Sequence, residues 1–434
     1  MVSENPPATH KQEVNTRTQK RHISEEPWTL WNWYQHIYWP YFTFLVIIPL
    51  LGIKAAINTP LHRETLILST IYYFITGLCI TAGYHRLWAH RSYSASFPLK
   101  FLLALFGTGS LTGSIIFWAR DHRAHHRFTD TDHDPYNVKK GFFHAHILWL
   151  ILKQPKKHNP VDISDLRNDP LVKYQHRYYF PIAFFMTWGF PTLVAGLGWN
   201  DWYGGFIYAG IIRTFLVQQA TFCVNSLAHY YGDQPFDDKR SARDHYLTSV
   251  IALGEGYHNF HHEFPSDYRN GIEFYHADIT KWLILVFKTI RLASGLKTFR
   301  QNEIDKSRVQ QAYRRLDKKK DVLDWGIPRE QLPVMEWEEF QNGVKEGRAL
   351  IAIDGVIHDV TGFITEHPGG ETMISSRVGK DGSAAFNGGI YKHSNAANNV
   401  LATMRIAVLL GGCEVETLKG NTNMETKEKM KIKS

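Results

Sequence analysis

Three histidines in the segment DHRAHHR have the spacing of one helix face. His122, His125 and His126 stand at positions i, i+3 and i+4, and residues three and four apart are neighbours on a helix surface. Neutral imidazole binds zinc, iron, copper and nickel, so the triplet indicates a metal site, although a solvated histidine-rich turn could share this sequence. The same spacing returns much later in the chain, at His258, His261 and His262. This recurrence favours metal binding.

Further histidines extend the pattern. HRLWAH contains His85 and His90, and NSLAH contains His229. The candidate metal ligands are therefore His85, His90, His122, His125, His126, His229, His258, His261 and His262. Nine imidazoles exceed what one tetrahedral or octahedral ion can bind, so the count predicts two metal ions. Asn225 lies one helical turn before His229 at the end of an apolar segment, where a buried amide needs a partner. Contact with metal or water and a helix-capping role both remain open for it.

Four apolar segments have about the length of ~20 residues that a membrane-spanning helix requires. They are Pro40–Ile57, Leu66–Ala82, Phe180–Gly198 and Gly204–His229. Four crossings leave both chain ends on one face of the membrane. Basic residues gather on that face, which predicts that it is cytosolic; they are Lys100, Arg120, Arg123, Lys139 and Lys140.

The apolar segment Phe97–Trp118 is predicted not to cross. If His90 and His122 bind one metal centre, they lie on the same side of the membrane, whereas a crossing would separate them by the ~30 Å of the hydrocarbon core. We therefore expect this segment to be half-embedded or re-entrant. The segment Trp28–Trp39 is rich in Trp and Tyr and is typical of a membrane interface.

Composition limits the class of protein. The chain has 434 residues and a formal net charge of +8, which suits anionic lipid headgroups or a phosphate-bearing substrate. No nucleic-acid-binding signature accompanies this charge, so we expect no nucleic-acid partner. Its three cysteines form no CxxC pattern, which argues against a disulfide framework. The polar first 26 residues lack the apolar core of a cleaved signal peptide.

The C-terminal segment has the features of a haem-binding domain. EHPGGETMI contains His367, and YKHSNAA contains His393. Two histidines on facing loops, lined by Ile364, Ile374 and Val400, suit bis-imidazole ligation of haem, while His358 is a poor competitor because it lies in a predicted strand. Haem with two protein ligands has no open position for oxygen, so electron transfer is the expected role. The chain carries no flavin or nicotinamide fingerprint, because FGTGSLTG lies in an apolar segment and has the wrong glycine spacing.

The three histidine motifs HRLWAH, DHRAHH and HNFHH, with NSLAH between the last two, resemble the histidine boxes of membrane acyl-CoA desaturases over residues 28–300. IDGVIHDVTGFITEHPGG and the downstream histidine resemble cytochrome b5, a combination found in the fungal Δ9-desaturases. The resemblance implies a di-iron centre held by the nine histidines, with Asn225 reaching one iron through water. It also implies haem b held by His367 and His393. Residues matching those that contact coenzyme A in the family are Trp118, Arg120, Asp121 and Lys153.

The same resemblance implies the reaction. It is O2-dependent desaturation of stearoyl-CoA or palmitoyl-CoA at the Δ9 position, with electrons passing from an NADH-cytochrome b5 reductase through the fused haem domain. An alkane C–H is not acidic, so acid–base chemistry cannot remove it, and the protein must position the chain and exclude water. We expect an apolar tunnel along Leu66–Ala82, with Ser69 and Tyr73 either closing its end or serving only helix packing. The predicted location is the endoplasmic reticulum membrane, with both termini cytosolic.

Three alternatives remain at this stage. The same di-iron site could act at another chain position or as a lipid hydroxylase. The chain could be a non-catalytic haem-binding membrane scaffold. A zinc-dependent membrane hydrolase is disfavoured because no HExxH motif is present.

The predicted fold is a mostly α membrane protein. Four transmembrane helices carry a cytosolic helical di-iron domain, and a small α+β cytochrome b5-like domain follows. The predicted divisions are a disordered cytosolic tail (1–27), the membrane desaturase domain (28–300), a charged linker (301–331), the haem domain (332–412) and a tail (413–434).

Overall fold

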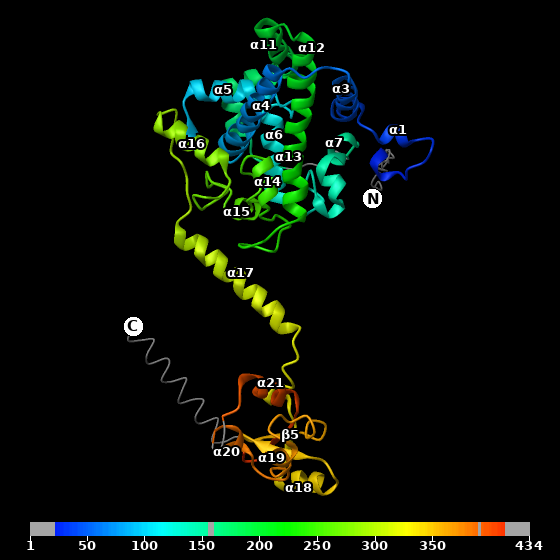
Figure 1. Cartoon of the computed structure of the whole chain (residues 1–434), viewed down its shortest axis with the longest axis vertical. Helices are drawn as coiled ribbons and strands as arrows, with labels where there is room; N and C mark the ends of the chain where they lie inside the picture. Colours follow the sequence, from blue (N-terminus) through cyan, green and yellow to red (C-terminus); the bar gives the residue numbers. More distant parts are fainter. Residues whose placement is uncertain (1–21, 155–159, 389–391, 413–434) are drawn as a thin grey trace, which may run out of the picture. The chain divides into compact units, whose positions relative to one another are not determined.

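The computed structural model describes residues 22–154, 160–388 and 392–412 (Figure 1). Contacts divide the chain into two compact units, residues 1–314 and 315–434, and each is described by itself. Residues 1–21 and 413–434, which belong to the predicted tails, lie outside the described residues. The first described element is the short 3-10 helix η1 (Ile23–Glu25).

Among the described residues of the first unit, four helices are long and apolar enough to cross a membrane. They run over Trp39–Ile57, Arg63–Ala89, Tyr179–Trp199 and Trp202–Tyr230. Each contains a π-helical stretch; the component elements are α2 (Trp39–Phe42), η2 (Thr43–Ile47), α3 (Ile48–Ile57), α4 (Arg63–Leu78), η3 (Cys79–Ala89), α10 (Tyr179–Phe184), η6 (Phe185–Gly189), α11 (Phe190–Trp199), α12 (Trp202–Gly204), η7 (Gly205–Ile212) and α13 (Arg213–Tyr230). Their outward faces carry exposed Leu50, Leu66 and Ile71, an arrangement that suits lipid rather than water. The four predicted spans are confirmed.

The second spanning helix is longer than the predicted segment Leu66–Ala82. It begins at Arg63 and continues as the π-helix η3 as far as Ala89. Every residue of η3 is buried, because this end of the helix enters the protein interior. His85 therefore lies on the spanning helix itself rather than in a connection after it.

The segment Phe97–Trp118 turns back, as predicted. Helix α5 (Phe97–Thr108) has 12 residues, fewer than the ~20 that a crossing requires. A turn over residues 109–114 leads to α6 (Ile115–Phe128), whose N-cap is Ser114. The Nε2 atoms of His90 and His122 are 2.8 Å apart, so the chain returns to the side from which it entered.

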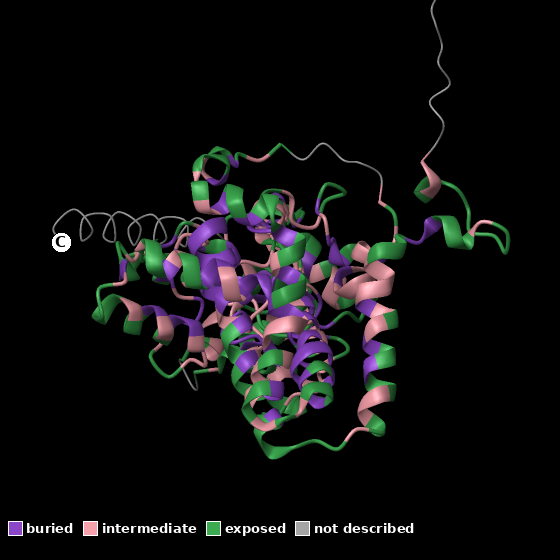
Figure 2. Ribbon diagram, turned by 90° about the horizontal axis from the view of Figure 1, so that it is seen from above, coloured by how far each residue is buried: buried purple, intermediate pink, exposed green. Residues whose placement is uncertain are grey.

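The first unit contains further, mostly short helices among its described residues. They are α1 (Trp33–His36), η4 (Val138–Lys140), η5 (His144–Leu148), α7 (Trp149–Ile151), α8 (Ser164–Asn168), α9 (Pro170–Arg177), α14 (Tyr246–Ile251), α15 (His258–Glu263) and α16 (Ile279–Thr289). An antiparallel pair joins β1 (Ser94–Ala95) to β2 (Ala293–Ser294). The largest buried apolar cluster joins residues of η3, α5, α6 and α16. Buried residues gather where helices pack together (Figure 2).

Helix α17 (Gln301–Asp321) follows, where a charged connector is predicted. Its first half is not an isolated solvated helix, since Ile304, Ser307 and Gln311 are buried. Ile304 packs in a cluster with Phe236, Phe260 and Phe264. The helical conformation agrees with the prediction, whereas the packing of one face was not foreseen.

The second unit is small and mixes helices with a sheet. Its four-stranded sheet has the order β3-β6-β5-β4, formed by β3 (Val334–Met335), β4 (Leu350–Ile353), β5 (Val356–Asp359) and β6 (Arg405–Leu409). The helices are η8 (Arg329–Gln331), α18 (Trp337–Lys345), α19 (Glu371–Ser375), α20 (Ser383–Phe386) and α21 (Asn395–Thr403). β5 pairs antiparallel with both β4 and β6, so His358 lies in a strand, as predicted.

Candidate metal centre

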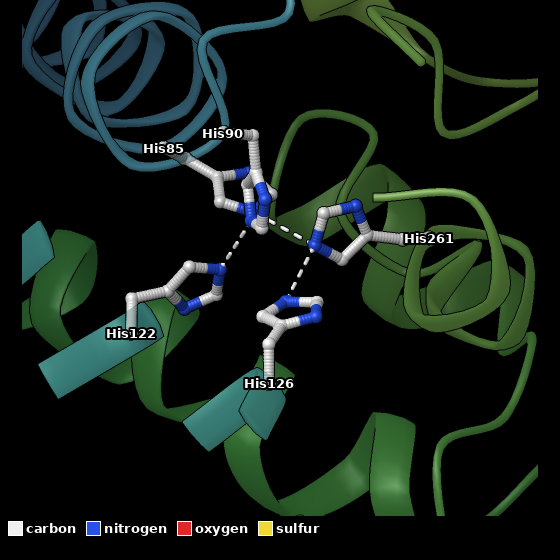
Figure 3. A group of neighbouring side chains, drawn as sticks. All are labelled: His85, His90, His122, His126 and His261. Atoms are coloured by element: carbon white, nitrogen blue, oxygen red, sulfur yellow. Dashed lines mark hydrogen bonds between the residues drawn. The ribbon is translucent and has the colours of Figure 1, made fainter. Parts of the chain in front are cut away.

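The nine predicted histidines converge in two groups. One contains five residues, His85, His90, His122, His126 and His261. The other contains four residues, His125, His229, His258 and His262. Within each group the candidate ligand atoms lie within 4.8 Å of one another. Figure 3 shows the five rings of the first group pointing toward one another from separate segments of the chain.

The two helices with the i, i+3, i+4 pattern divide their histidines between the groups. On α6, His122 and His126 join the first group while His125 joins the second. On α15, His261 joins the first group while His258 and His262 join the second. The two groups therefore lie side by side along both helices.

Distances between ring nitrogens fit bound cations better than a hydrogen-bond network. Nε2 of His261 lies 3.0 Å from Nε2 of both His85 and His126, and a single N–H can serve only one of these contacts. Nε2 of His262 is likewise 3.0 Å from that of His258 and 3.2 Å from that of His125. A cation accepts several nitrogen lone pairs at once, which suits this crowding.

His229 gives a separate indication in the second group. Its Nδ1 lies 2.8 Å from the hydroxyl of Ser241. Its Nε2 is buried and has no hydrogen-bond partner among the described residues. Such an orphaned nitrogen is costly in a protein interior, and a metal ion would satisfy it.

The protonation state of the rings also fits metal binding. Burial, reinforced by the neighbouring histidines, holds the pKa of six rings well below the ordinary value; they are His90, His122, His126, His258, His261 and His262. Neutral imidazole is the form that coordinates metals.

Two carboxylates that the sequence did not predict contact the Nδ1 atoms of two of the clustered histidines. Nδ1 of His85 lies 2.7 Å from Glu255, and Nδ1 of His125 lies 2.9 Å from Asp134. Burial alone would raise the pKa of Glu255, but His85 and Arg86 lower it to about 2. Carboxylates behind metal-binding histidines orient the ring and increase its basicity. The position of Glu255 three residues before His258 was the one available signal.

An apolar cavity of about 360 Å³ ends at the histidines. Its wall includes His85, His122 and His258 at this end, together with Asn225. Tyr73 also lines the cavity, and its hydroxyl donates to the carbonyl of Ile251 at 2.9 Å. Ser69 does not line it; its hydroxyl donates to the Thr65 carbonyl within its own helix.

Two of the remaining predicted site residues line the cavity, and the other two are exposed. Trp118 lines the cavity and stacks on His122, with ring centroids 4.9 Å apart. Asp121 also lines the cavity, and its carboxylate accepts from the guanidinium of the exposed Arg120 at 2.7 Å. Burial raises the pKa of Asp121. Lys153 is exposed, and its backbone N–H donates to the carbonyl of His36.

A second cavity, of about 790 Å³, lies in the C-terminal unit. Both His367 and His393 line it, as do Ile374 and Val400, whereas Ile364 packs in the adjoining core. Nδ1 of His367 donates to the carbonyl of Gly370 at 3.0 Å, and Nδ1 of His393 donates to that of Phe386 at 2.9 Å. In a neutral ring the unprotonated nitrogen is then Nε2, the atom with which each histidine would bind a haem iron.

Known proteins share both units. Residues 64–285 match the family model of the fatty acid desaturases, and residues 336–410 match that of the cytochrome b5-like haem/steroid-binding domain. The chain is 52% identical to a probable acyl-CoA desaturase of Schizosaccharomyces pombe, across 93% of this chain and 84% of the relative. It is 48% identical to acyl-CoA desaturase 1 of Saccharomyces cerevisiae, across 92% and 78% of the two chains.

The stearoyl-CoA desaturase of Homo sapiens is 41% identical across 52% of this chain and 64% of the relative. These matches confirm the resemblance seen in the histidine motifs and the fold class expected from it. With its four apolar spans, the protein is a multi-pass membrane oxidoreductase. The chain belongs to the fatty acid desaturase family and carries a cytochrome b5-like domain at its C-terminal end.

Proposed function

We propose that this desaturase introduces a double bond at the Δ9 position of stearoyl-CoA or palmitoyl-CoA, using O2. The observation that carries the proposal is the apolar cavity that ends at two groups of buried and half-buried histidines. The names of the relatives, acyl-CoA and stearoyl-CoA desaturases, support this substrate class.

The nine histidines are proposed to hold two iron ions, five around one and four around the other, and Asn225 is proposed to reach one of the ions through water. Bound iron supplies the oxidising power, with O2, that removal of hydrogen from an unactivated methylene requires. The chain's own residues bind the acyl group, orient it and exclude water. The cavity wall is mostly apolar, and Tyr73 stands at a position where it can limit chain length.

Binding of the coenzyme A headgroup of the substrate is assigned mainly to residues in the first half of α6. Arg120 can contact a phosphate of coenzyme A because a guanidinium matches phosphate oxygens in pairs. Trp118, Asp121 and Lys153 are proposed to assist. The distance from this anchor to the histidines then selects the methylene that reacts.

Electrons enter through the C-terminal unit. Each turnover removes two hydrogens from the substrate and reduces O2 to two water molecules, which needs two more electrons and two protons. We propose that His367 and His393 would hold haem b, which when bound would supply one-electron transfer from an NADH-cytochrome b5 reductase. The linked haem domain has a high effective concentration near the desaturase unit.

The proposed location is the endoplasmic reticulum membrane, with both termini cytosolic. An even number of spans and the basic residues on the histidine side support this orientation. The proposed divisions remain a tail (1–27), the desaturase domain (28–300), a linker (301–331), the haem domain (332–412) and a second tail (413–434).

Anaerobic reconstitution tests the proposal. The purified full chain is loaded with iron and haem, supplied with stearoyl-CoA, NADH and a cytochrome b5 reductase, and then exposed to O2. Oleoyl-CoA is the expected product. A double bond at another position would favour a desaturase of different regioselectivity, and a hydroxylated chain would favour a lipid hydroxylase. A protein that binds no metal beyond haem would favour the non-catalytic haem-binding scaffold.

A further inference from the structure

A buried cation lies within the bundle of membrane helices. Arg213 belongs to the span Trp202–Tyr230, and 1% of its surface is exposed. Its guanidinium donates to the carbonyls of Gly109 at 2.9 Å and Thr187 at 3.0 Å, and it lies 4.5 Å from the ring centroid of Tyr72. Among the described residues no carboxylate forms an ion pair with it. A charge at this depth is expensive and typically has a role in function.

Arg213 contacts the end of the re-entrant helix. The last carbonyls of any helix lack partners within it, and at membrane depth there is no bulk water to satisfy them. Gln218, on the same helix as Arg213, donates its amide N–H groups toward the carbonyls of Ser110 and Leu111 at 3.4 and 3.3 Å. Arg213 and Gln218, here called the polar clamp, therefore hold three successive carbonyls after α5.

The turn held by the polar clamp is strained. Leu111 has a backbone φ of +53°, a left-handed conformation that is costly for a bulky residue. Such strain persists only where surrounding contacts impose it. The polar clamp supplies those contacts, together with the hydroxyl of Thr187, which donates to the Gly109 carbonyl at 3.3 Å.

This same turn forms part of the substrate cavity. Leu111, Gly113 and Ser114 line the wall. Ser114 also begins α6, since its hydroxyl accepts from the backbone N–H of Phe117, and α6 carries three of the clustered histidines. The opposite end of α13 carries Asn225 and His229, so one helix connects the polar clamp to the metal-binding residues.

We propose that Arg213 and Gln218 are positioning residues that set which part of the acyl chain lies beside the histidines. They do so by fixing the residue 109–114 turn as a wall of the cavity. The inference rests on the proposed function and deepens it, because it assigns regioselectivity to a polar contact inside the membrane. Neither residue lines the cavity itself.

Gln218→Leu in the full chain tests the polar clamp, with Gln219→Leu as the matched control. Gln219 is the next residue, is absent from the cavity wall, and accepts from Nε2 of His146 instead of contacting the turn. In Gln218→Leu we expect kcat to fall roughly 10- to 100-fold, as for a substrate held out of position. KM for stearoyl-CoA, iron content and haem content should stay at the wild-type values, and part of the product should carry a displaced double bond.

Hydrogen–deuterium exchange gives a readout that does not depend on activity. The amides of residues 110–114 should exchange faster in Gln218→Leu and at the wild-type rate in Gln219→Leu. If Gln218→Leu showed the wild-type rate of amide exchange at residues 110–114 and formed the wild-type product, the inference would be overturned. It would also be overturned if this variant lost iron in proportion to its loss of activity. If Gln218→Leu does not accumulate, Thr187→Val removes one donor to the same turn at constant size and should give the same changes in smaller degree. A wild-type protein that forms no product would refute the proposed function, while the exchange comparison would still decide on the polar clamp.

Discussion

At the scale of single residues, the outer nitrogens of the clustered histidines decide how the rings are held. Nδ1 faces Glu255 in the case of His85 and Asp134 in the case of His125. A ring that donates through Nδ1 presents an unprotonated Nε2. Glu255 also accepts from Arg86 at 3.0 Å, and Arg86 in turn is paired with Asp278 at 2.9 Å. The orientation of His85 thus depends on a buried network of charges.

Replacing Glu255 with Gln should weaken metal binding by the first group. The substitution keeps the shape but removes the negative charge that Arg86 and His85 share, and loss of such a partner typically costs about 10- to 100-fold in metal affinity. Iron retained after a timed exposure to a chelator measures the effect. Glu263→Gln, an exposed carboxylate on α15, is the control and should retain iron like the wild type. Equal retention in both variants would contradict the role given to Glu255.

Shortening Tyr73 should lengthen the accepted acyl chain. The phenol lines the cavity and is fixed by its hydrogen bond to Ile251, so Tyr73→Ala opens space where the chain would end. Competition between acyl-CoA substrates of different length, followed by product analysis, measures the preference. Ser69→Ala is the control, since Ser69 does not line the cavity. A Tyr73→Ala protein with the wild-type preference would show that the cavity ends elsewhere.

The spacing in the sequence marks the nine histidines that the fold brings together, whereas the residues that contact them give little signal. His122, His125 and His126 are recognisable because a helical spacing of a single residue type is visible in the sequence alone. Asp134 and Asp278 carry no comparable signal, since each lies in a connection whose path depends on the assembled fold. Ser69 and Tyr73 were indistinguishable by spacing, and only the packing of α4 against its neighbours separates them.

At the scale of elements, helix α17 supports the histidine-bearing helix α15. Phe260 stands between the histidines of α15 and packs with Phe236, Phe264 and Ile304. Ser307 adds a hydrogen bond from its hydroxyl to the Phe236 carbonyl at 3.2 Å. Helix α17 is therefore coupled through one apolar cluster to the residues proposed to bind iron.

Ile304→Ala should destabilise this part of the protein by about 2–5 kcal/mol, the usual range for removing a fully buried isoleucine side chain to alanine. We expect a lower midpoint of thermal unfolding and faster loss of iron on heating. Val309→Ala, on the exposed face of the same helix, should leave both properties unchanged. If Ile304→Ala had the same unfolding midpoint and the same rate of iron loss as Val309→Ala, helix α17 would not support α15.

The helices that could be predicted from the sequence are those whose existence follows from apolar composition and length alone. Four apolar runs of sufficient length marked the spans, and the distance argument for His90 and His122 identified the segment that turns back. The continuation of the second helix through η3 was not predictable, because HRLWAH is polar enough to read as a connection. Its burial is imposed by partners distant in sequence, such as Glu255 and Asp278.

At the scale of the whole molecule, one chain combines the proposed catalyst with its electron donor. His367→Ala should abolish haem absorbance and reduce NADH-dependent desaturation to near zero, while iron bound by the desaturase unit stays at the wild-type level. Adding a separate cytochrome b5 domain should restore turnover, but only at high concentration, because fusion raises the effective concentration of the donor domain. Full activity without haem would refute electron transfer through this domain.

The distribution of the histidines along the chain also governs when the site can form during synthesis. The five-residue group includes His261, and the four-residue group includes His258 and His262. Neither group is complete until residues that follow the last span Trp202–Tyr230 have left the ribosome. A nascent chain that stops after its fourth span lacks ligands from both groups. The proposed iron site can therefore be completed only after the last of the four spans has been synthesised, and a chain truncated before residue 258 would lack candidate ligands of both groups.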